Sequence, residues 1–345
     1  MPTIEIKSPL ALAVPAPVRI DVPADQLPKG ELLVLRSASG APGIPAQPDG
    51  DAAIVALIGP LPAGISQRYE LEAEPDARPG VAVTAAGKQL DVTLAGKPFT
   101  SYHYDNAFAR PFLYPVLGPG QHPVTRNYPM QQLPGEDHDH PHHRSWWTAY
   151  GEVNGADDWS EERGHGFIRH QAFRSQTSGP VFGGFVAENL WTGPDGAPLL
   201  RETRSVRAYN AGDERRLVDY DVVLTAAGGD VTFGDTKEGG IISFRVATSM
   251  DANKGGRIEN ASGGVTEKEC WGKPSNWCDY SGPVDGSVVG IAVLDHPGNF
   301  RHPAHWHVRG YGLMGSNVFG DSSFAGDPGK RGQYTLPKGQ SLTFR

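Results

Sequence analysis

Residues 183–226, GGFVAENLWTGPDGAPLLRETRSVRAYNAGDERRLVDYDVVLTA, contain three apolar or alternating runs separated by two turn sequences. The turns are GPDG at 193–196 and AGDE at 211–214, both typical of β-hairpins. Neighbouring side chains of a strand point to opposite faces, so this alternation indicates strands that bury one face. We therefore predict strands joined by these two hairpin turns, with further strands at 166–176 and 241–249.

The rest of the chain after residue 80 follows the same pattern. Short runs at 81–84, 90–94 and 99–104 are joined by turns that contain glycine, and little of the sequence indicates a helix. The 44 glycines and 30 prolines fit many short strands with long loops. We predict an all-β chain built on a large antiparallel β-sandwich, whose last runs lie at 288–295, 304–311 and 340–345. Because the last run reaches the final residue, we expect the natural protein to continue beyond Arg345.

The first 76 residues form a separate group of strand-like pieces. These lie at 3–6, 18–22, 31–35, 53–58 and 69–73, between segments rich in proline, glycine and aspartate. The sequence PDARPG at 75–80 then resembles a junction. For 345 residues we favour two domains over one large one: a small N-terminal β-sandwich at 1–76 and the large domain at 80–345.

Charge and missing motifs exclude several classes of function. The net charge is -8 and no block of lysine or arginine occurs, so we expect neither a nucleic-acid partner nor a membrane partner. No run approaches the roughly 18 to 20 apolar residues that span a bilayer, and the N-terminus lacks an export pattern, which predicts a cytoplasmic location. Glycine-rich nucleotide loops, HExxH and GxSxG are also absent.

The two cysteines, Cys270 and Cys278, are too few for a disulfide framework. Two unpaired thiols and a local bridge across the intervening loop both remain possible.

Histidine is concentrated in one part of the chain. All 12 histidines lie between His103 and His307, and six fall within residues 122–165. The densest run is GEDHDHPHHRSWW at 135–147, where Pro141 disfavours a helix and favours an extended backbone at His140. Alternation would then place Glu136, His138, His140, His142 and Arg144 on one face, and Asp137, Asp139, His143 and Ser145 on the other. Imidazoles backed by carboxylates have a fixed tautomer and a tuned pKa.

A second histidine cluster, RHPAHWH at 301–307, also contains a proline that favours extension. If His140 or His142 met His305 or His307 with a carboxylate, the result would be an acid–base pair or a metal centre. For a divalent metal, the candidate ligands are His138, His140, His305 and His307.

A charged turn, DTKEGG at 235–240, precedes an apolar run. Glu238 is a candidate acid or base there, with Lys237 or Asp235 as its partner, and an ordinary hairpin turn is the alternative.

Arginines and tryptophans surround the histidine run. The guanidinium groups of Arg110, Arg126 and Arg144 suit a substrate carboxylate, with surface ion pairs as the alternative. Indole faces stack on sugar rings, which favours Trp146 and Trp271 as a platform, although at least half of the tryptophans are expected in the core.

Three segments resemble a known bacterial family: SYHYDNAFARPFLYPVLGPGQHPVTRNYP at 101–129, GEDHDHPHHRSWWTAYGEVNGADDW at 135–159 and DTKEGGIISFRVA at 235–247. The family comprises uncharacterised domains called methane-oxygenase-like, or PmoA-like, and the resemblance runs from about residue 80 to the end. Because no segment here spans a membrane, it does not imply the activity of a membrane oxygenase. It implies a carbohydrate context, because such domains are associated with polysaccharide and sugar catabolism. Many relatives begin with an export signal, which makes a periplasmic location the alternative.

The order of the elements is also similar to the supersandwich of galactose-mutarotase-like proteins, which implies a broad antiparallel sheet whose His and Glu side chains handle a sugar.

We therefore expect an enzyme that acts on a saccharide or sugar acid by acid–base chemistry, through β-elimination, dehydration or hydrolysis. The predicted catalytic residues are His140, His142, His143, Glu238 and His305. The predicted substrate-binding residues are His103, Arg110, Arg126, Arg144, Trp146 and Trp271. A metal-dependent enzyme and a carbohydrate-binding protein without activity are the alternatives.

Overall fold

The computed structural model describes residues 2–28, 32–74 and 80–345, and confirms the all-β prediction. In that part of the chain, antiparallel strands account for nearly all regular structure and the helices are at most one or two turns long. None of these helices has the length and apolar character needed to cross a membrane. The predicted junction at 75–80 lies almost entirely outside the described residues.

The N-terminal strands form one six-stranded antiparallel sheet in the order β1-β6-β3-β4-β5-β2. The sheet curves around a cluster of its own, in which Ile4, Leu35 and Ile54 are buried together. Gln47 joins this unit to the rest of the molecule, because its side-chain oxygen accepts hydrogen bonds of 3.0 Å from the backbone N–H groups of Val181 and Phe182. The strands are β1 (Thr3–Lys7), β2 (Ala16–Asp21), β3 (Leu32–Ser37), β4 (Ile44–Pro48), β5 (Ala53–Ile58) and β6 (Ser66–Glu74).

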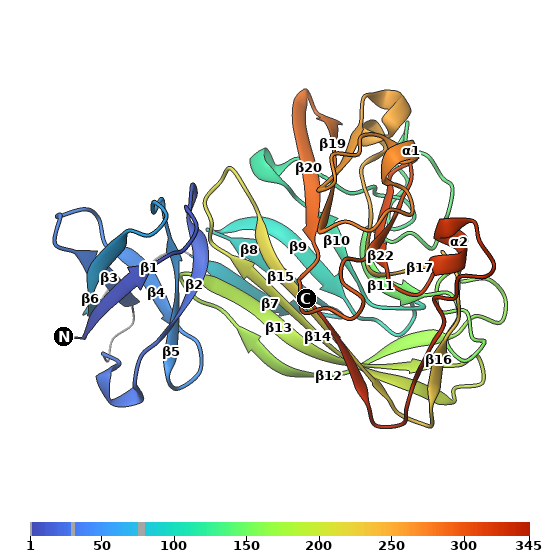
Figure 1. The fold of residues 1–345 in the computed structure, drawn as a ribbon, viewed down its shortest axis with the longest axis horizontal. Coiled ribbons are helices and arrows are strands. Elements are labelled where there is room, and N and C mark those ends of the chain that lie inside the picture. The colour runs from blue at the N-terminus through green and yellow to red at the C-terminus, as the bar shows by residue number, and fades with distance from the viewer. Residues whose placement is uncertain (1, 29–31, 75–79) are drawn as a thin grey trace.

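Two sheets form the framework of residues 80–345 (Figure 1). The first has eight strands in the order β21-β22-β17-β11-β10-β9-β8-β7, and the second has five in the order β12-β13-β14-β15-β24. The eight-stranded sheet comprises β7 (Val81–Ala86), β8 (Gln89–Leu94), β9 (Lys97–His103), β10 (Phe112–Val116), β11 (Trp146–Tyr150), β17 (Gly239–Arg245), β21 (His305–Val308) and β22 (Leu313–Asn317). The five-stranded sheet comprises β12 (Phe167–Thr177), β13 (Phe182–Thr192), β14 (Pro198–Tyr209), β15 (Leu217–Ala226) and β24 (Ser341–Phe344).

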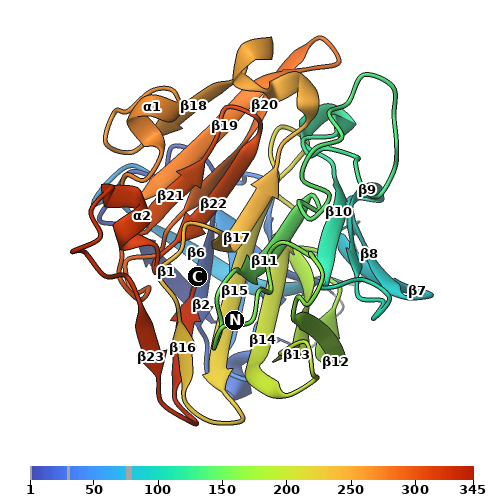
Figure 2. The same cartoon turned by 90° about the vertical axis from the view of Figure 1, so that its right-hand side faces the viewer.

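The two large sheets bury their facing side chains in one shared core. Trp146 and Phe244 of the first sheet lie in the same cluster as Tyr220 and Val222 of the second. Figure 2 shows the five-stranded sheet beneath strands β11 and β17. The predicted strands and hairpins at 166–226 are confirmed as β12 to β15, and in β14 and β15 the alternation matches burial of every second residue.

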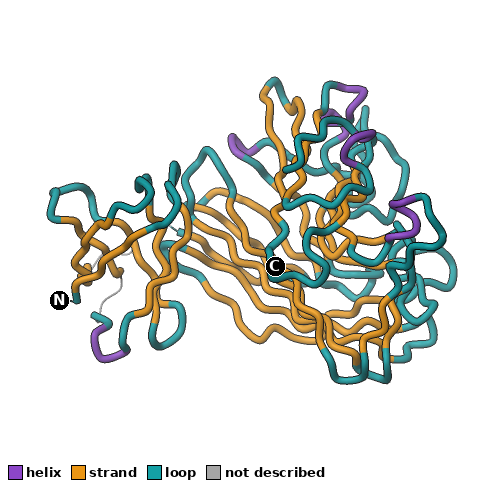
Figure 3. The backbone as a smooth tube through the Cα atoms, in the orientation of Figure 1, coloured by secondary structure: helices purple, strands orange, loops and turns teal. Residues whose placement is uncertain are grey.

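Smaller elements cover one end of the larger unit, as the tube in Figure 3 shows. Cys278 lies in β19 of a three-stranded sheet and Cys270 ends the short helix α1. Both cysteines are free and buried, so no local bridge forms. The remaining strands are β16 (Val231–Phe233), β18 (Arg257–Asn260), β19 (Trp277–Val284), β20 (Ser287–Leu294) and β23 (Tyr334–Leu336). The helical turns are η1 (Ala24–Gln26), η2 (Pro119–Gln121), η3 (Thr248–Met250), η4 (Ala252–Lys254), α1 (Glu267–Cys270) and α2 (Asp321–Ala325).

Candidate functional site

The outer face of the eight-stranded sheet carries a row of residues paired across six strands. In the order of the strands across the sheet, these residues are His103, Phe112, Trp147, Ser243, Gly315 and His307. Residues paired in this way point to the same face, so the row is a continuous strip that faces away from the shared core. The histidine-rich segment lies against this strip, where the ring of His143 stacks on Trp147 with 5.2 Å between ring centres.

The segment at 135–145 is a turn and not a strand, so the predicted alternation of faces is wrong. His140 has a φ of 44° and Ser145 a φ of 60°, both in the left-handed region. The N–H of His143 donates to the carbonyl of His140 at 3.0 Å, which closes a tight turn. The rings of His140, His142 and His143 therefore gather on one side. Their ring centres lie 4.4 to 5.7 Å apart.

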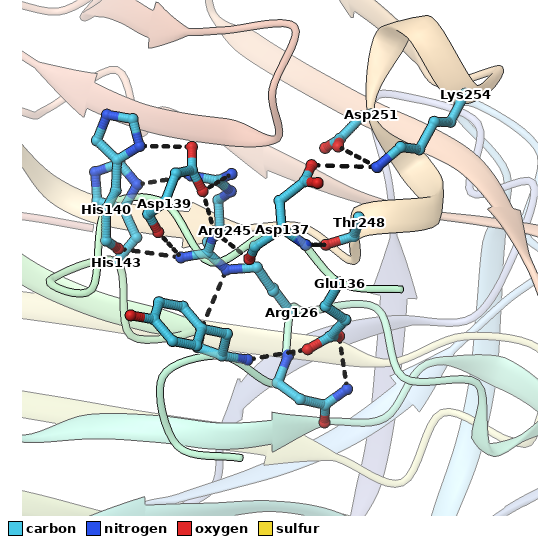
Figure 4. Close-up of polar contacts among 12 residues, drawn as sticks. Arg126, Glu136, Asp137, Asp139, His140, His143, Arg245, Thr248, Asp251 and Lys254 are labelled. Carbon is cyan, nitrogen blue, oxygen red and sulfur yellow. Dashed lines mark hydrogen bonds and ion pairs between the residues drawn. The ribbon is translucent and has the colours of Figure 1, made fainter. Parts of the chain in front are cut away.

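Arg126 explains why the segment bends. Its guanidinium group is fully buried and donates to the carbonyl oxygens of Asp137, Asp139 and His140 at 2.9 to 3.2 Å. It also pairs with the carboxylate of Asp139 (Figure 4). Four bonds to one short segment offset the cost of a left-handed residue. The bonds from Arg126 therefore outweigh the preference for an extended backbone that Pro141 creates at His140. Arg126 positions the loop, and the prediction that it binds substrate is not supported.

Asp139 and His140 form a carboxylate–imidazole pair at the solvent edge of this loop. One oxygen of Asp139 accepts from Nδ1 of His140 at 2.6 Å, and the other accepts from Arg245 at 2.7 Å as well as from Arg126. Burial opposes ionisation of Asp139, but Arg245, His140 and Arg126 outweigh it and hold its pKa at about 2. With Nδ1 engaged, the free Nε2 of His140 is the nitrogen that can exchange a proton, and its side chain is 40% exposed.

Two further imidazoles beside this pair are neutral at neutral pH. Burial lowers the pKa of His142 to about 4, with help from the charges of Arg110 and His140. Burial also holds the pKa of His143 well below its ordinary value, with His142 and Arg245 acting in the same direction. Arg245 lies 3.2 Å from Nδ1 of His143. Since arginine only donates, Nδ1 of His143 accepts and its proton resides on Nε2.

Tyr311 and Arg245 complete the cluster, and sequence analysis missed both. The Tyr311 ring is nearly parallel to that of His140, with 5.0 Å between ring centres, and Arg245 lies 4.9 Å from the centre of the Tyr311 ring. Burial raises the pKa of Tyr311. No local motif marks either residue, because Arg245 lies within the predicted run 241–249 and Tyr311 ends the predicted run 304–311. Only the register that pairs Arg245 with Leu313 brings them to the loop.

The second histidine cluster does not join the first. His302 binds Asp295 at 2.6 Å, and His305 stacks on Phe324 with Asp321 at 3.6 Å. His305 therefore does not meet the loop histidines as predicted. His307 is 2% exposed, and neither ring nitrogen makes a hydrogen bond of normal geometry. Its pKa falls to about 4, chiefly because of burial.

The four candidate metal ligands are likewise apart. His138 stacks on Tyr128, with 4.6 Å between ring centres. Within 2–28, 32–74 and 80–345, no three side chains of the His, Cys, Asp and Glu types converge in a way that would hold a metal ion. The arrangement therefore does not supply the predicted ligand set of His138, His140, His305 and His307.

The negative charge of Glu238 partly offsets the lowering of the pKa of both His142 and His307. Glu238 forms an ion pair with Lys237, and both side chains are partly exposed. Asp235 is occupied elsewhere, because its carboxylate accepts from the backbone N–H groups of Ser322 and Gly332. The predicted partner of Glu238 is therefore Lys237 and not Asp235.

The other predicted binding residues support the loop or lie away from it. Arg110 is buried and donates to the carbonyl oxygens of His142, Asp158 and Trp159. Arg144 makes two bonds of 2.9 and 2.7 Å to Glu161. The ring of His103 binds the carbonyl of Tyr114 at 2.8 Å and stacks on Phe112. None of these three groups is open for a substrate in this arrangement.

The two tryptophans proposed as a sugar platform are also placed differently. Trp146 lies in the shared core against Tyr220 and Phe244. Trp271 packs against Phe324, beside the second histidine cluster. The platform prediction for Trp146 is therefore wrong, because the first residue of β11 points inward and Trp147 points outward.

The opposite end of the loop is tied down by acidic groups (Figure 4). Lys254 lies 3.1 Å from Asp137 and 3.2 Å from Asp251. Burial, followed by a hydrogen bond with Asp137, raises the pKa of Asp251 to about 6. Glu136 accepts from the backbone N–H groups of Asn127 and Tyr128 at 3.1 Å. The loop is thus held at both ends.

A family model, described as "Family of unknown function (DUF6807)", matches residues 89–345, which include every residue of this site. The chain belongs to this family. No curated protein matches the chain. The DUF6807 match begins at the first residue of β8, so the N-terminal sheet lies outside it.

Proposed function

We propose that this DUF6807 protein is an enzyme that uses acid–base chemistry on a sugar acid or a related saccharide, with His140 as the general base. The observation that carries the proposal is the Asp139–His140 pair. A carboxylate with a pKa of about 2 holds Nδ1 of the imidazole at 2.6 Å, and the partly exposed ring leaves Nε2 to accept a proton.

The charge balance around the loop supports an anionic substrate. Four arginines surround it, namely Arg110, Arg126, Arg144 and Arg245, and they pair with only two carboxylates, Asp139 and Glu161. Guanidinium groups held in this way can stabilise negative charge that develops beside them. A neutral His143 with its proton on Nε2 adds a hydrogen-bond donor that needs no change of charge.

These groups suit β-elimination or dehydration. In such a step, Nε2 of His140 takes the proton from the carbon next to the carboxylate, and the developing enolate is stabilised by the cationic groups. The group at the neighbouring carbon then leaves with its bonding electrons and gains a proton, from Tyr311 or Glu238. When the departing group is a hydroxyl, it leaves as water after gaining the proton, and the net reaction is a dehydration.

The sugar part of the proposal rests on the resemblance of residues 101–129, 135–159 and 235–247 to a family associated with sugar catabolism. The assignment of a sugar as substrate therefore stays a prediction. The proton-transfer part rests on the loop itself, so the two parts are tested separately.

The test is a screen of oligosaccharides and sugar acids read by mass spectrometry. Loss of the mass of water indicates dehydration, and gain of that mass indicates hydrolysis. On an active substrate, His140→Ala should lower kcat by about 10²- to 10⁴-fold. His138→Ala is the matched control, because His138 lies two residues away and stacks on Tyr128 outside the cluster. Full turnover by His140→Ala, or equal losses in both variants, would rule out this base.

A further inference from the structure

Strand β20 presents an unprotected edge. It is the last strand of the sheet β18-β19-β20, and β19 is its only strand neighbour among the described residues. Its sequence, SVVGIAVL, contains no charge and no proline. Proteins generally protect edge strands with charged residues, prolines or bulges, because unpaired backbone groups otherwise pair with another chain. This edge has none of those residues.

The two faces of β20 differ in exposure. Val288 and Leu294 are 80% and 71% exposed, which makes them the most exposed large hydrophobic residues of 80–345. Val289, Ile291 and Val293 are only partly exposed, and the whole run from Val288 to Leu294 borders a cavity of about 1210 Å³ between β20 and β15. Figure 1 shows the β19–β20 hairpin at the top of the molecule. The outward face therefore exposes two apolar side chains six residues apart.

The turn determines which backbone groups of β20 are free. Asp285 and Gly286 form a two-residue turn with φ values of 48° and 79°, so Val284 and Ser287 exchange both hydrogen bonds. From there every second residue of β20 bonds to β19. The N–H and C=O groups directed away from β19 belong to Val288, Gly290, Ala292 and Leu294, the residues whose side chains face outward.

We propose that two copies of this chain associate by antiparallel pairing of β20 with β20 about a two-fold axis at Ile291. Antiparallel pairing places residues of the same face opposite each other. Centring the axis on Ile291 puts Val288 opposite the partner's Leu294 and Leu294 opposite the partner's Val288. The two most exposed side chains thus cover each other twice in one dimer. The free N–H and C=O groups at these positions bond across the same interface.

A second copy is the occupant favoured by the sequence of the strand. An uncharged strand offers no electrostatic feature that would select a different partner, whereas its two exposed apolar side chains are symmetric about Ile291. A closed two-fold pair also removes both free edges at once, which leaves no strand for a third copy.

The test is sedimentation velocity of the full chain over a range of concentrations. We expect a monomer–dimer equilibrium whose Kd rises at least roughly ten-fold in Val288→Lys, since the change places a charge against an apolar partner twice in each dimer. Leu294→Glu should have the same effect. Leu10→Lys is the control, because Leu10 is 74% exposed but lies in the N-terminal unit, and it should leave Kd unchanged. A wild-type chain that stays monomeric, or a dimer that Val288→Lys does not weaken, overturns the proposal.

A double variant tests the register. Combining Val288→Lys with Leu294→Glu places opposite charges across the two-fold axis and should restore the wild-type Kd to within about three-fold. Within one chain these positions lie about 20 Å apart along the strand, so they cannot pair with each other. A double variant that dimerises as weakly as the single variants overturns the axis at Ile291. Circular dichroism of each variant confirms that the exposed substitutions leave the fold intact.

Discussion

The two histidine-rich regions, at 138–143 and 302–307, have similar composition and each contains a proline, yet they are built differently. In the first, a buried arginine holds a tight turn and brings three imidazoles together. In the second, His302 pairs with Asp295, His305 stacks on Phe324, and His307 is buried beside Phe324 without a hydrogen bond of normal geometry. Histidine content therefore does not make a site. A site needs a neighbour that fixes the backbone and leaves ring nitrogens free.

The largest expected effect comes from removing the arginine that holds the first region. Arg126→Met leaves three backbone carbonyls and Asp139 without their buried donor, so the free energy of unfolding should fall by about 3 kcal/mol. Arg301→Met is the control from the second region, because Arg301 also donates to carbonyl groups but is exposed, and should cost less than about 1 kcal/mol. Urea unfolding measures both, and equal losses would contradict the role of Arg126.

A change of intermediate size is expected in the pH dependence of the free energy of unfolding, and it arises from His142. Its pKa in the folded state is about 4, below the ordinary value of 6.5, so the unfolded chain takes up the proton first as pH falls. Above pH 6.5 both states are neutral and the stability is fully present. Between pH 6.5 and 4, the free energy of unfolding of the wild type should fall by about 2 kcal/mol relative to that of His142→Asn. The fall is smaller than the full pKa shift implies because the ring is only partly buried.

Denaturant unfolding at several pH values measures this difference. His138→Asn is the control for an asparagine in the same loop. A gap between wild type and His142→Asn that stays constant from pH 7 to 4 would show that the loop does not keep this ring neutral.

The smallest effect is expected at His307. Its ring has no hydrogen bond of normal geometry, so His307→Leu removes a poorly satisfied polar group and should change the free energy of unfolding by less than about 1 kcal/mol. His143→Leu, in the first region, loses the contact with Arg245 and should cost about 1 to 3 kcal/mol. If His307→Leu were the more damaging substitution, the second region would contain a contact that this arrangement does not show.

The sequence predicted the strands well and the loop poorly, for a physical reason. Alternation at 200–210 and 216–226 reflects burial of one face, which is a local property, and β14 and β15 follow it. The backbone of His140 is set instead by Arg126, which lies 14 residues away in sequence. A rule for the residue before proline cannot include such contacts.

The site residues divide in the same way. His140, His142 and His143 were predicted from their density in the sequence, and the structure brings them together. Their catalytic role stays a prediction. The partners that give them chemical character, Arg245 and Tyr311, come from strand pairing at the far end of the chain. Their importance was therefore not visible without the fold.

Arg126 grips the loop mainly through carbonyl oxygens, which every amino acid possesses. The shape of the turn consequently depends little on the identity of several of its side chains. Substitution of a residue such as His138 should therefore leave the form of the turn intact. This makes the turn a suitable place to begin laboratory evolution.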